Sequence, residues 1–525
     1  SRLAFSPALV GAATTELAGI GSNVNAAAAT AALPTTEILT AGADEVSEAL
    51  AALFTSHGQQ FQAVAGQLST SYGQMVGNLT ATLNTYTTTE AANLSQLASP
   101  AAVINDPIRE FTGRPLFGDG VNGYTNAQGV GTAGGAGGWL FGNGGTGGTS
   151  TAEGVTGGAG GSGGLFFGNG GTGGTSTFGG GTGGPGGTAG LLFGNGGTGG
   201  TSGPGGAGGI GGGGGLLGQA GTAGVSTALA PNQILIRTGS WGNPELNISV
   251  GGGPSLPVVL DSGASGLVVP PNFVDLANLD PVMNGQHQAT GAVSYGGTLF
   301  INYDVYSTTV NFGNGIVTDT TNVGVATSAY HHVINNPSHQ ISDLGSLPVY
   351  LGIGPNNPYP FATSVIEALP DHLDDGLLIN LPRGLAEFGP NPLPDSAISV
   401  SGSPIADVQV SLNGRPAIPT SAFLDSGGAL GAVPESLVTG SGIGSPGGGG
   451  QLPAGTTIAV YASQDDGGHL LYTQTVSADH RPYVLTGQNA RFNTGSYPFS
   501  QMPIYISNEN PSATIGEGGA TIFPG

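Results

Sequence analysis

The sequence contains no cysteine and no lysine, and it has no long apolar run. Without cysteine, disulfides, thiolate nucleophiles and cysteine zinc sites are excluded, although the compartment stays open. The 8 basic residues, all arginine, face 31 acidic ones, and the net charge of −23 disfavours nucleic acid and anionic lipid as partners. No segment approaches the roughly 20 apolar residues of a membrane-spanning helix, and no conventional signal peptide is visible. We expect no transmembrane segment, and any export must use another signal.

The composition divides the chain. Its 525 residues suffice for several domains, and the 102 glycines are concentrated in one stretch instead of being spread evenly. We predict four segments: a helical hairpin over 1–100, a linker over 101–130, a Gly-rich repeat region over 131–225 and a mostly β region over 226–525.

The first segment is Ala-rich and has a high helix propensity between about residues 4 and 96. Pro34 interrupts it, and Thr35 or Thr36 before Glu37 is the expected start of a second helix. Beyond that point apolar or aromatic residues, with His57 among them, recur every 3 or 4 positions from Val46 to Tyr86, the period of a helical stripe. A hairpin can bury one stripe, and a second apolar face needs a cover. A helical partner would supply it, whereas a self-contained pair or a homodimer remains open.

Three further features accompany the hairpin: Ala41-Gly-Ala-Asp-Glu-Val46, the Tyr86-Thr-Thr-Thr-Glu90 spacing and Gly113-Arg-Pro-Leu-Phe-Gly-Asp-Gly120. Together with the repeats, they resemble the first 225 or so residues of mycobacterial PE-PGRS proteins, although Pro7-Ala8 stands where that family has Pro-Glu. The resemblance implies export by a type VII secretion system with Tyr86 and Glu90 as part of the signal. It also implies a PPE-type helical partner, a secretion chaperone, and a location at the cell wall, at the cell surface or outside the cell.

The Gly-rich region repeats with a period of 26 residues: Trp139–Ser150 returns as Leu165–Ser176 and as Leu191–Ser202. So few apolar side chains are typical of disorder. Alternatively, the regular Gly-Gly-x spacing permits close-packed extended chains, anchored by the Phe-containing triplets at 139–141, 165–167 and 191–193. Asn143, Asn169 and Asn195 stand where calcium-binding β-rolls need Asp, so we expect no metal. A spacer is the simplest role.

Two similar segments mark the last region, Val258–Pro270 and Ala422–Pro434. Each ends an apolar strand with Leu-Asp-Ser-Gly and places Pro nine residues after the Asp. Two carboxyl groups about 3 Å apart can share one proton, because both cannot ionise in a site of low dielectric. We predict that Asp261 and Asp425 form such a pair. Gly263 and Gly427 would let the loops approach, and Ser262 and Ser426 would hydrogen-bond across to the opposite loop.

These segments resemble the two active-site loops of the pepsin family, which implies an all-β, two-lobed aspartic protease over 226–525. Val293–Asp304 resembles the flap hairpin that closes over the substrate, with Tyr295 as the flap tyrosine followed by Gly296 and Gly297. Val349–Gly354 and Thr514–Gly516 resemble the strands behind the two aspartates. Ala264 and Gly428 replace the Ser or Thr that hydrogen-bonds each carboxylate in pepsins, and Val268 replaces the Trp that braces the flap tyrosine.

The expected activity is therefore cleavage of proteins or peptides by an Asp–Asp pair and an activated water, without any cofactor. Self-cleavage near residues 220–230 would follow if the protease is tethered by an exposed spacer. A non-catalytic surface, adhesion or host-interaction protein on a protease-like scaffold is the alternative. Ser262 or Ser426 as a nucleophile would need a positioned histidine, and the histidines show no such spacing.

Overall fold

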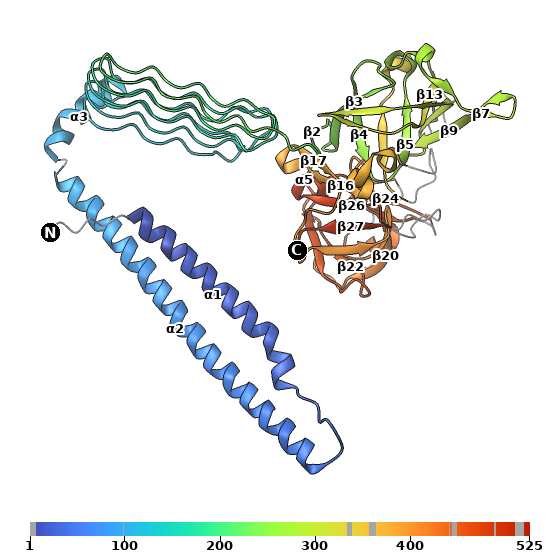
Figure 1. Cartoon of the computed structure of the whole chain (residues 1–525), viewed down its shortest axis with the longest axis horizontal. Coiled ribbons are helices and arrows are strands. Elements are labelled where there is room, and N and C mark those ends of the chain that lie inside the picture. Colours follow the sequence, from blue (N-terminus) through green and yellow to red (C-terminus); the bar gives the residue numbers. More distant parts are fainter. Residues whose placement is uncertain are drawn as a thin grey trace. The chain divides into compact units, whose positions relative to one another are not determined.

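The computed structural model describes residues 7–97, 99–332, 339–355, 364–439, 441–443, 449–487, 490–509 and 519–525. The chain divides into two compact units, Ser1–Gly113 and Arg114–Gly525. The first unit is helical (Figure 1). Its helices are α1 (Pro7–Thr36), α2 (Glu45–Leu97) and α3 (Ser99–Thr112).

The turn of the hairpin lies later than the sequence predicts. Helix α1 continues through Pro34 to Thr36, so the expected helix start at Thr35 or Thr36 is wrong. Helix α2 begins after Asp44, whose carboxylate accepts the backbone N–H groups of Val46 and Ser47 at 3.1 and 2.9 Å. Asp44 thus satisfies N–H groups that have no partner within the helix, which Thr35 and Thr36 cannot do because their hydroxyls bond back into α1. Part of the predicted linker, up to Thr112, is also helical.

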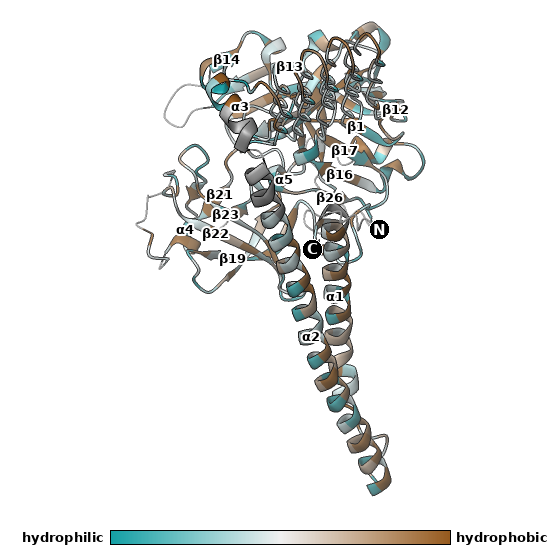
Figure 2. Cartoon of the chain, turned by 90° about the vertical axis from the view of Figure 1, so that its left-hand side faces the viewer, coloured by the Kyte–Doolittle hydropathy of each residue, from teal (hydrophilic) through white to brown (hydrophobic). Residues whose placement is uncertain are grey.

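Small residues form the contact between α1 and α2. A side chain at Gly58 would come within 2.2 Å of the Thr35 carbonyl oxygen, and one at Gly21 within 2.9 Å of the Tyr72 ring. Much of the predicted apolar stripe on α2 stays exposed, including Phe61, which is 58% exposed. Figure 2 shows this mixture of polar and apolar residues along both helices. None of the described helices is long and apolar enough to cross a membrane.

The Gly-rich repeats form an ordered array of extended chain segments that lie nearly parallel in Figure 1. Backbone hydrogen bonds link successive repeats, for example Gly144 N–H to Asn169 O at 2.8 Å, and other bonds link segments within a repeat, such as Gly161 N–H to Gly145 O at 2.7 Å. A Cβ at Gly144 would lie 1.8 Å from the Gly161 carbonyl oxygen. Only glycine fits such contacts, so the structure favours the close-packed alternative over disorder.

Side chains at equivalent positions of successive repeats contact one another and hold the repeats in alignment. The rings of Phe117, Phe141, Phe167 and Phe193 stack in sequence, with centroid distances of 5.7, 5.2 and 5.1 Å. The Asn residues that replace calcium-ligating Asp also have a structural use. Asn143 Oδ1 accepts the N–H of the next repeat's Asn at 2.8 Å, and the ladder continues in the same way.

The repeats also contact the β region within the second unit. Phe178 is buried, and a side chain at Gly384 would come within 2.3 Å of its ring. Gly179 N–H donates to the Arg383 carbonyl at 2.7 Å, and Thr238 N–H donates to the Glu153 carboxylate at 3.0 Å. The repeat region is therefore packed against the β domain at its edge, in addition to being joined to it.

The C-terminal domain is all-β apart from short helices, and its two curled sheets flank a third (Figure 1). The twelve-stranded sheet of the first lobe contains β2 (Arg237–Thr238), β3 (Pro244–Val250), β4 (Leu256–Asp261), β5 (Ser265–Val269), β6 (Asp280–Pro281), β9 (Thr290–Tyr295), β10 (Leu299–Thr308), β11 (Val310–Gly313), β12 (Ile316–Val317), β13 (Thr321–His331), β14 (His339–Ile341) and β15 (Tyr350–Ile353). The seven-stranded sheet of the second lobe contains β19 (Ile405–Leu412), β20 (Ile418–Phe423), β21 (Ala432–Pro434), β22 (Thr457–Ala462), β23 (Leu470–Thr475), β24 (Tyr483–Leu485) and β25 (Phe492–Asn493).

A six-stranded sheet joins the lobes, in the order β1-β17-β16-β26-β27-β18. Its strands are β1 (Gln233–Leu235), β16 (Gly376–Asn380), β17 (Leu385–Phe388), β18 (Ile398–Ser401), β26 (Ile504–Ser507) and β27 (Ala520–Phe523). The remaining elements are β7 (Met283–Asn284), β8 (His287–Gln288), α4 (Glu435–Val438) and α5 (Tyr497–Gln501), besides single turns of 3-10 helix.

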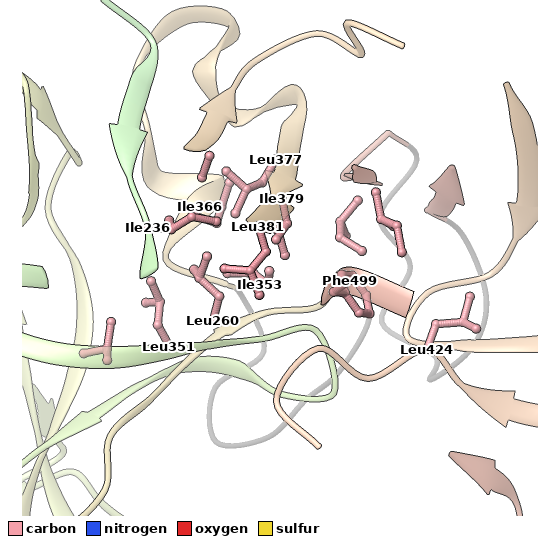
Figure 3. Close-up of a cluster of buried hydrophobic side chains, with 14 of the residues drawn as sticks. Ile236, Leu260, Leu351, Ile353, Ile366, Leu377, Ile379, Leu381, Leu424 and Phe499 are labelled. Carbon is pink, nitrogen blue, oxygen red and sulfur yellow. The ribbon is translucent and has the colours of Figure 1, made fainter. Parts of the chain in front are cut away.

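One continuous hydrophobic core runs through all three sheets. Leu260 and Leu424, the residues directly before the two candidate aspartates, are fully buried in it. Figure 3 shows both side chains in this cluster, Leu260 near Leu351 and Ile353 of β15, and Leu424 on the side of Phe499. Burial of a leucine contributes about 2 kcal/mol. The core therefore fixes the strand ends from which both candidate loops leave.

Candidate active site

The two Asp-Ser-Gly loops leave equivalent strands, one in each lobe. Strand β4 ends at Asp261, and β20 ends two residues before Asp425. Behind the first loop, β15 pairs in parallel with β4, so that Gly352 lies opposite Asp261, and it pairs antiparallel with β5. This matches the strand predicted over Val349–Gly354.

Behind the second loop, the corresponding strand is β25. It pairs in parallel with β20 and antiparallel with β21, as β15 does in the first lobe. The apolar-Gly pattern predicts this strand at Thr514–Gly516, which lies outside the described residues. The position is occupied by Phe492–Asn493, in which Asn493 lies opposite Phe423 as Tyr350 lies opposite Val259, and this polar segment does not fit the apolar-Gly pattern.

Four hydrogen bonds tie the loops to each other through Ser262 and Ser426. Ser262 Oγ accepts the N–H of Ser426, and Ser426 Oγ accepts the N–H of Ser262, both at 2.9 Å. Each hydroxyl also donates across the lobes: Ser262 to the Leu424 carbonyl at 2.6 Å and Ser426 to the Leu260 carbonyl at 2.8 Å. Both serines are completely buried. Each hydroxyl proton is donated to a backbone carbonyl and not to a base, which suits a structural role and not that of a nucleophile.

The glycines bring the two carboxyl groups together. A Cβ at Gly263 would lie 3.0 Å from Asp425 Oδ1 and 3.1 Å from Asp261 Oδ1, and one at Gly427 only 2.4 Å from Asp261 Cγ. Burial raises the pKa of Asp261 well above its ordinary value of 3.8, and the Asp425 carboxylate together with a hydrogen bond to it acts in the same direction. The two side chains are thus within hydrogen-bonding reach. This arrangement allows one proton to be shared.

The two carboxyl groups have different hydrogen-bond partners. Asp261 Oδ1 accepts the Gly263 N–H at 2.8 Å. Asp425 Oδ1 accepts the N–H groups of Gly427 and Gly428 at 3.0 and 2.8 Å, and its Oδ2 accepts the Asn493 side-chain amide at 2.7 Å. The amide of Asn493 was not predicted, because nothing in the local sequence links it to a loop 68 residues away.

Strands β9 and β10 form the predicted flap hairpin, with Tyr295 opposite Leu299 across the turn. Gly296 and Gly297 form that turn with φ values of +58° and +67°, which glycine adopts without strain. The ring of Tyr295 lies 4.5 Å from that of Tyr350 on β15. Burial raises the pKa of Tyr295, and the Asp261 carboxylate raises it further, which places the phenol beside the pair.

Tyr350 therefore braces Tyr295 where pepsins use the Trp that Val268 replaces. Burial raises the pKa of Tyr350 as well, and Asp261 and Asp425 contribute. The role of Tyr350 could hardly be predicted from the sequence, because it is a single aromatic residue within the predicted strand behind Asp261.

The remaining predicted residues lie in the first unit. Tyr86 is on α2 and is 53% exposed. Glu90 follows on the same helix, but its side chain lies outside the described part of the structure. Within the described residues, no three His, Asp or Glu side chains are grouped so as to hold a metal ion.

Comparison with known proteins gives the family. Residues 3–93 match the PE family, residues 117–176 and 160–217 match PGRS repeats, and residues 232–517 match the PE-PGRS C-terminal aspartyl peptidase-like domain. PE cleavage protein A of Mycobacterium tuberculosis is 38% identical in an alignment 582 residues long, which covers 100% of this chain and 99% of that protein.

A second relative with the same name, from Mycobacterium marinum, is 37% identical over 573 residues, again with 100% and 99% coverage. The PE-PGRS family protein PE_PGRS18 of Mycobacterium tuberculosis is 48% identical over 138 residues, 26% of this chain. The chain thus belongs to the PE-PGRS family, carries a C-terminal aspartyl peptidase-like domain and is homologous to PE cleavage protein A.

Proposed function

We propose that residues 226–525 are an aspartic endopeptidase in which Asp261 and Asp425 are the catalytic residues. The observation that carries this proposal is the crossed pair of serine hydrogen bonds, which holds two buried loops so that their carboxyl groups share a hydrogen bond. A scaffold without this chemistry would gain nothing from bringing two acidic groups together, because their repulsion destabilises the fold.

The reaction follows from one ionised and one protonated carboxyl group. The ionised aspartate removes a proton from a water held between the pair, and the water oxygen bonds to the carbonyl carbon of the substrate. The protonated aspartate gives its proton to the carbonyl oxygen. The resulting tetrahedral diol collapses when its C–N bond breaks: the aspartate that took the water proton gives it to the amine nitrogen, and the other aspartate takes a proton from a diol hydroxyl, which leaves a carboxylic acid and restores the pair. The flap carrying Tyr295 would cover the bound peptide and exclude bulk water.

The direct test is cleavage of a peptide library by the purified chain and by two variants, Asp261→Asn and Asp425→Asn. Each variant should lower kcat/KM by at least about 1,000-fold, because neither carboxamide can exchange a proton with water or substrate. Asp407→Asn, an exposed position on β19, is the matched control and should cleave as the wild type does. A pepstatin-type inhibitor should bind the wild type.

Wild-type activity in either dyad variant would show that the pair is not catalytic. A wild type without activity on any peptide, together with no inhibitor binding, would favour the alternative of a surface or host-interaction protein on a protease-like scaffold. The contacts of Asn493 and Tyr350 weaken that alternative, because they replace contacts that Gly428 and Val268 cannot make.

For the substrate we propose the chain itself or other exported surface proteins. The relatives' name describes them as PE cleavage proteins, and residues 220–230 of this chain join the repeats to the protease. Val225 in that segment is 66% exposed. Mass spectrometry of the incubated wild-type chain should reveal a cut there that is missing from Asp261→Asn, whereas an intact wild-type chain would exclude self-processing.

The first unit would serve export. We propose that Tyr86 and Glu90 form part of a type VII secretion signal read with a secretion chaperone, and that the protein reaches the cell wall, the cell surface or the medium. An apolar groove of about 890 Å³ between α1 and α2 is lined by residues such as Ile20, Val24, Phe61 and Leu68. Such a groove suits the apolar face of a PPE-type helical partner.

A further inference from the structure

The two Asp-Ser-Gly loops differ in the groups that surround the carboxyl oxygens of their aspartates. In the second loop, Gly428 stands three residues after Asp425, where a hydroxyl would have donated to the carboxylate. A Cβ at Gly428 would lie 2.7 Å from Asp425 Oδ2 and 3.1 Å from Asn493 Oδ1. The space of the missing hydroxyl is therefore occupied by the amide of Asn493.

The orientation of this amide is fixed by a second hydrogen bond. Asn493 Oδ1 accepts the N–H of Gly495 at 2.8 Å, so the NH₂ end must face Asp425 Oδ2, which it meets at 2.7 Å. The Asn493 backbone is also fixed, because β25 lies between β20 and β21. The amide donor of Asn493 is thus held in place before any substrate binds.

Among the described groups, Asp425 accepts three hydrogen bonds from the protein and Asp261 accepts one. In the first loop Ala264 has no hydroxyl to offer, and its backbone N–H lies 3.4 Å from the Asp261 carbonyl oxygen instead. Donors stabilise a carboxylate more than a carboxylic acid. The charge should therefore rest on the aspartate with more donors.

We infer that Asn493 is a positioning residue that keeps Asp425 as the ionised member of the pair and leaves the shared proton on Asp261. This inference rests on the proposed protease function and adds the direction of proton transfer. The Asp425 carboxylate removes the proton from the attacking water, while the Asp261 carboxyl group protonates the substrate's carbonyl oxygen.

The other titratable and charged groups near the two aspartates do not change this assignment of the shared proton. The phenols of Tyr295 and Tyr350 face it, and burial raises the pKa of both, so they stay neutral at any pH at which the pair titrates. On the segment of Asn493, the guanidinium of Arg491 lies over the ring of Phe423, 5.7 Å from its centre. The amide of Asn493 is thus the side-chain donor whose removal should change the titration.

The test compares pH profiles of kcat/KM for the wild type, Asn493→Leu and Asn493→Ala. Leucine keeps most of the volume and loses the donor, so the first ionisation of the pair becomes harder. The acidic limb should move to higher pH by about one unit in both variants. Asn508→Leu is the matched control: this buried amide donates to the Asp374 carbonyl at 3.0 Å, so its loss should lower stability without moving the limb.

An acidic limb that coincides with the wild type in both Asn493 variants would overturn the inference. A second measurement is independent of activity: ¹³C NMR titration of the full chain with labelled aspartate carboxyl groups, assigned by the two Asp→Asn variants. The first ionisation should appear at Asp425 in the wild type, and its appearance at Asp261 would also overturn the inference. If the wild type cleaves nothing, the proposed function fails, and the titration still decides where the proton is.

Discussion

The two Asp-Ser-Gly loops share Leu, Asp, Ser, Gly, Val and Pro at matching positions and have the same strand framework, yet they are not equivalent. Ser262 and Ser426 exchange mirror-image hydrogen bonds, whereas the carboxyl group of Asp425 collects donors that Asp261 lacks. The symmetric part is the structural link between the lobes. The asymmetric part surrounds the carboxyl groups, where the proposed catalysis requires one acid and one base.

The difference originates in the strands behind the loops. Strand β15 presents Tyr350 two residues before the level of Asp261, and its ring packs against Tyr295 of the hairpin. At the equivalent position, strand β25 presents Asn493, which fills the space left by Gly428. A duplicated fold thus keeps its backbone hydrogen bonds and differentiates its halves by single side chains.

The largest expected difference lies between the glycines. In Gly427→Ala the new methyl group would sit 2.4 Å from Asp261 Cγ, so the carboxyl group must move. A displacement of this size should lower kcat/KM at least about 100-fold. In Gly263→Ala the nearest atom is 3.0 Å away, and a shift of a few tenths of an ångström suffices. Kinetics with a peptide substrate should rank Gly427→Ala well below Gly263→Ala, and equal activities would show that the loops are packed symmetrically.

The serines should behave alike. Ser262→Ala and Ser426→Ala each leave one buried N–H and one buried carbonyl of the opposite loop without a partner. Each should reduce the free energy of unfolding by about 2–3 kcal/mol, measured by denaturant titration of the domain's tryptophan signal or by thermal unfolding. Ser346→Ala, whose hydroxyl bonds locally in an exposed turn, is the control. If only one of the two serine variants lost stability, the two serines would not contribute equally to the link between the lobes.

The repeated Asp-Ser-Gly motif was sufficient to predict the lobes, the pair and the crossed serines, because each follows from residues that stand next to one another in the sequence. Asn493 and Tyr350 were not predictable in this way. Each acts through a contact made by strand pairing, and an isolated Asn or Tyr carries no motif. The helical hairpin is a second example. Pro34 predicts a break at that residue, but α1 continues through it, and the cap at Asp44 decides where α2 begins.

The Gly-rich region could be read only as two alternatives. Its composition is typical of disorder, because glycine loses much conformational entropy on ordering. What compensates is the hydrogen bonding of almost every repeat to the next, as in the bond from Gly170 N–H to Asn195 O at 2.9 Å. These bonds join residues about one 26-residue period apart, so they depend on the register of many repeats at once. Neither composition nor a single repeat reveals that register.

The smallest expected difference concerns stability when each aspartate is replaced by asparagine. The pKa of Asp261 is raised above its ordinary value of 3.8, so the folded state holds the proton more tightly than the unfolded chain does. Its stabilising contribution is present below about pH 4 and is lost as the pH rises through the raised pKa. Asp261→Asn does not titrate, so its stability relative to the wild type should increase across that range, by about 1 kcal/mol or more.

Asp425→Asn should be the less stable of the two variants at both pH values, because the carboxamide cannot accept all three hydrogen bonds that the carboxylate accepts. Thermal unfolding of both variants at pH 4 and pH 7 makes the comparison, with Asp407→Asn as the control for loss of an exposed charge. If Asp425→Asn were the more stable variant, the asymmetry between the two loops would be reversed. Equal stabilities would mean that the donors around Asp425 do not distinguish the two carboxyl groups, and the difference between the loops would then be one of shape alone.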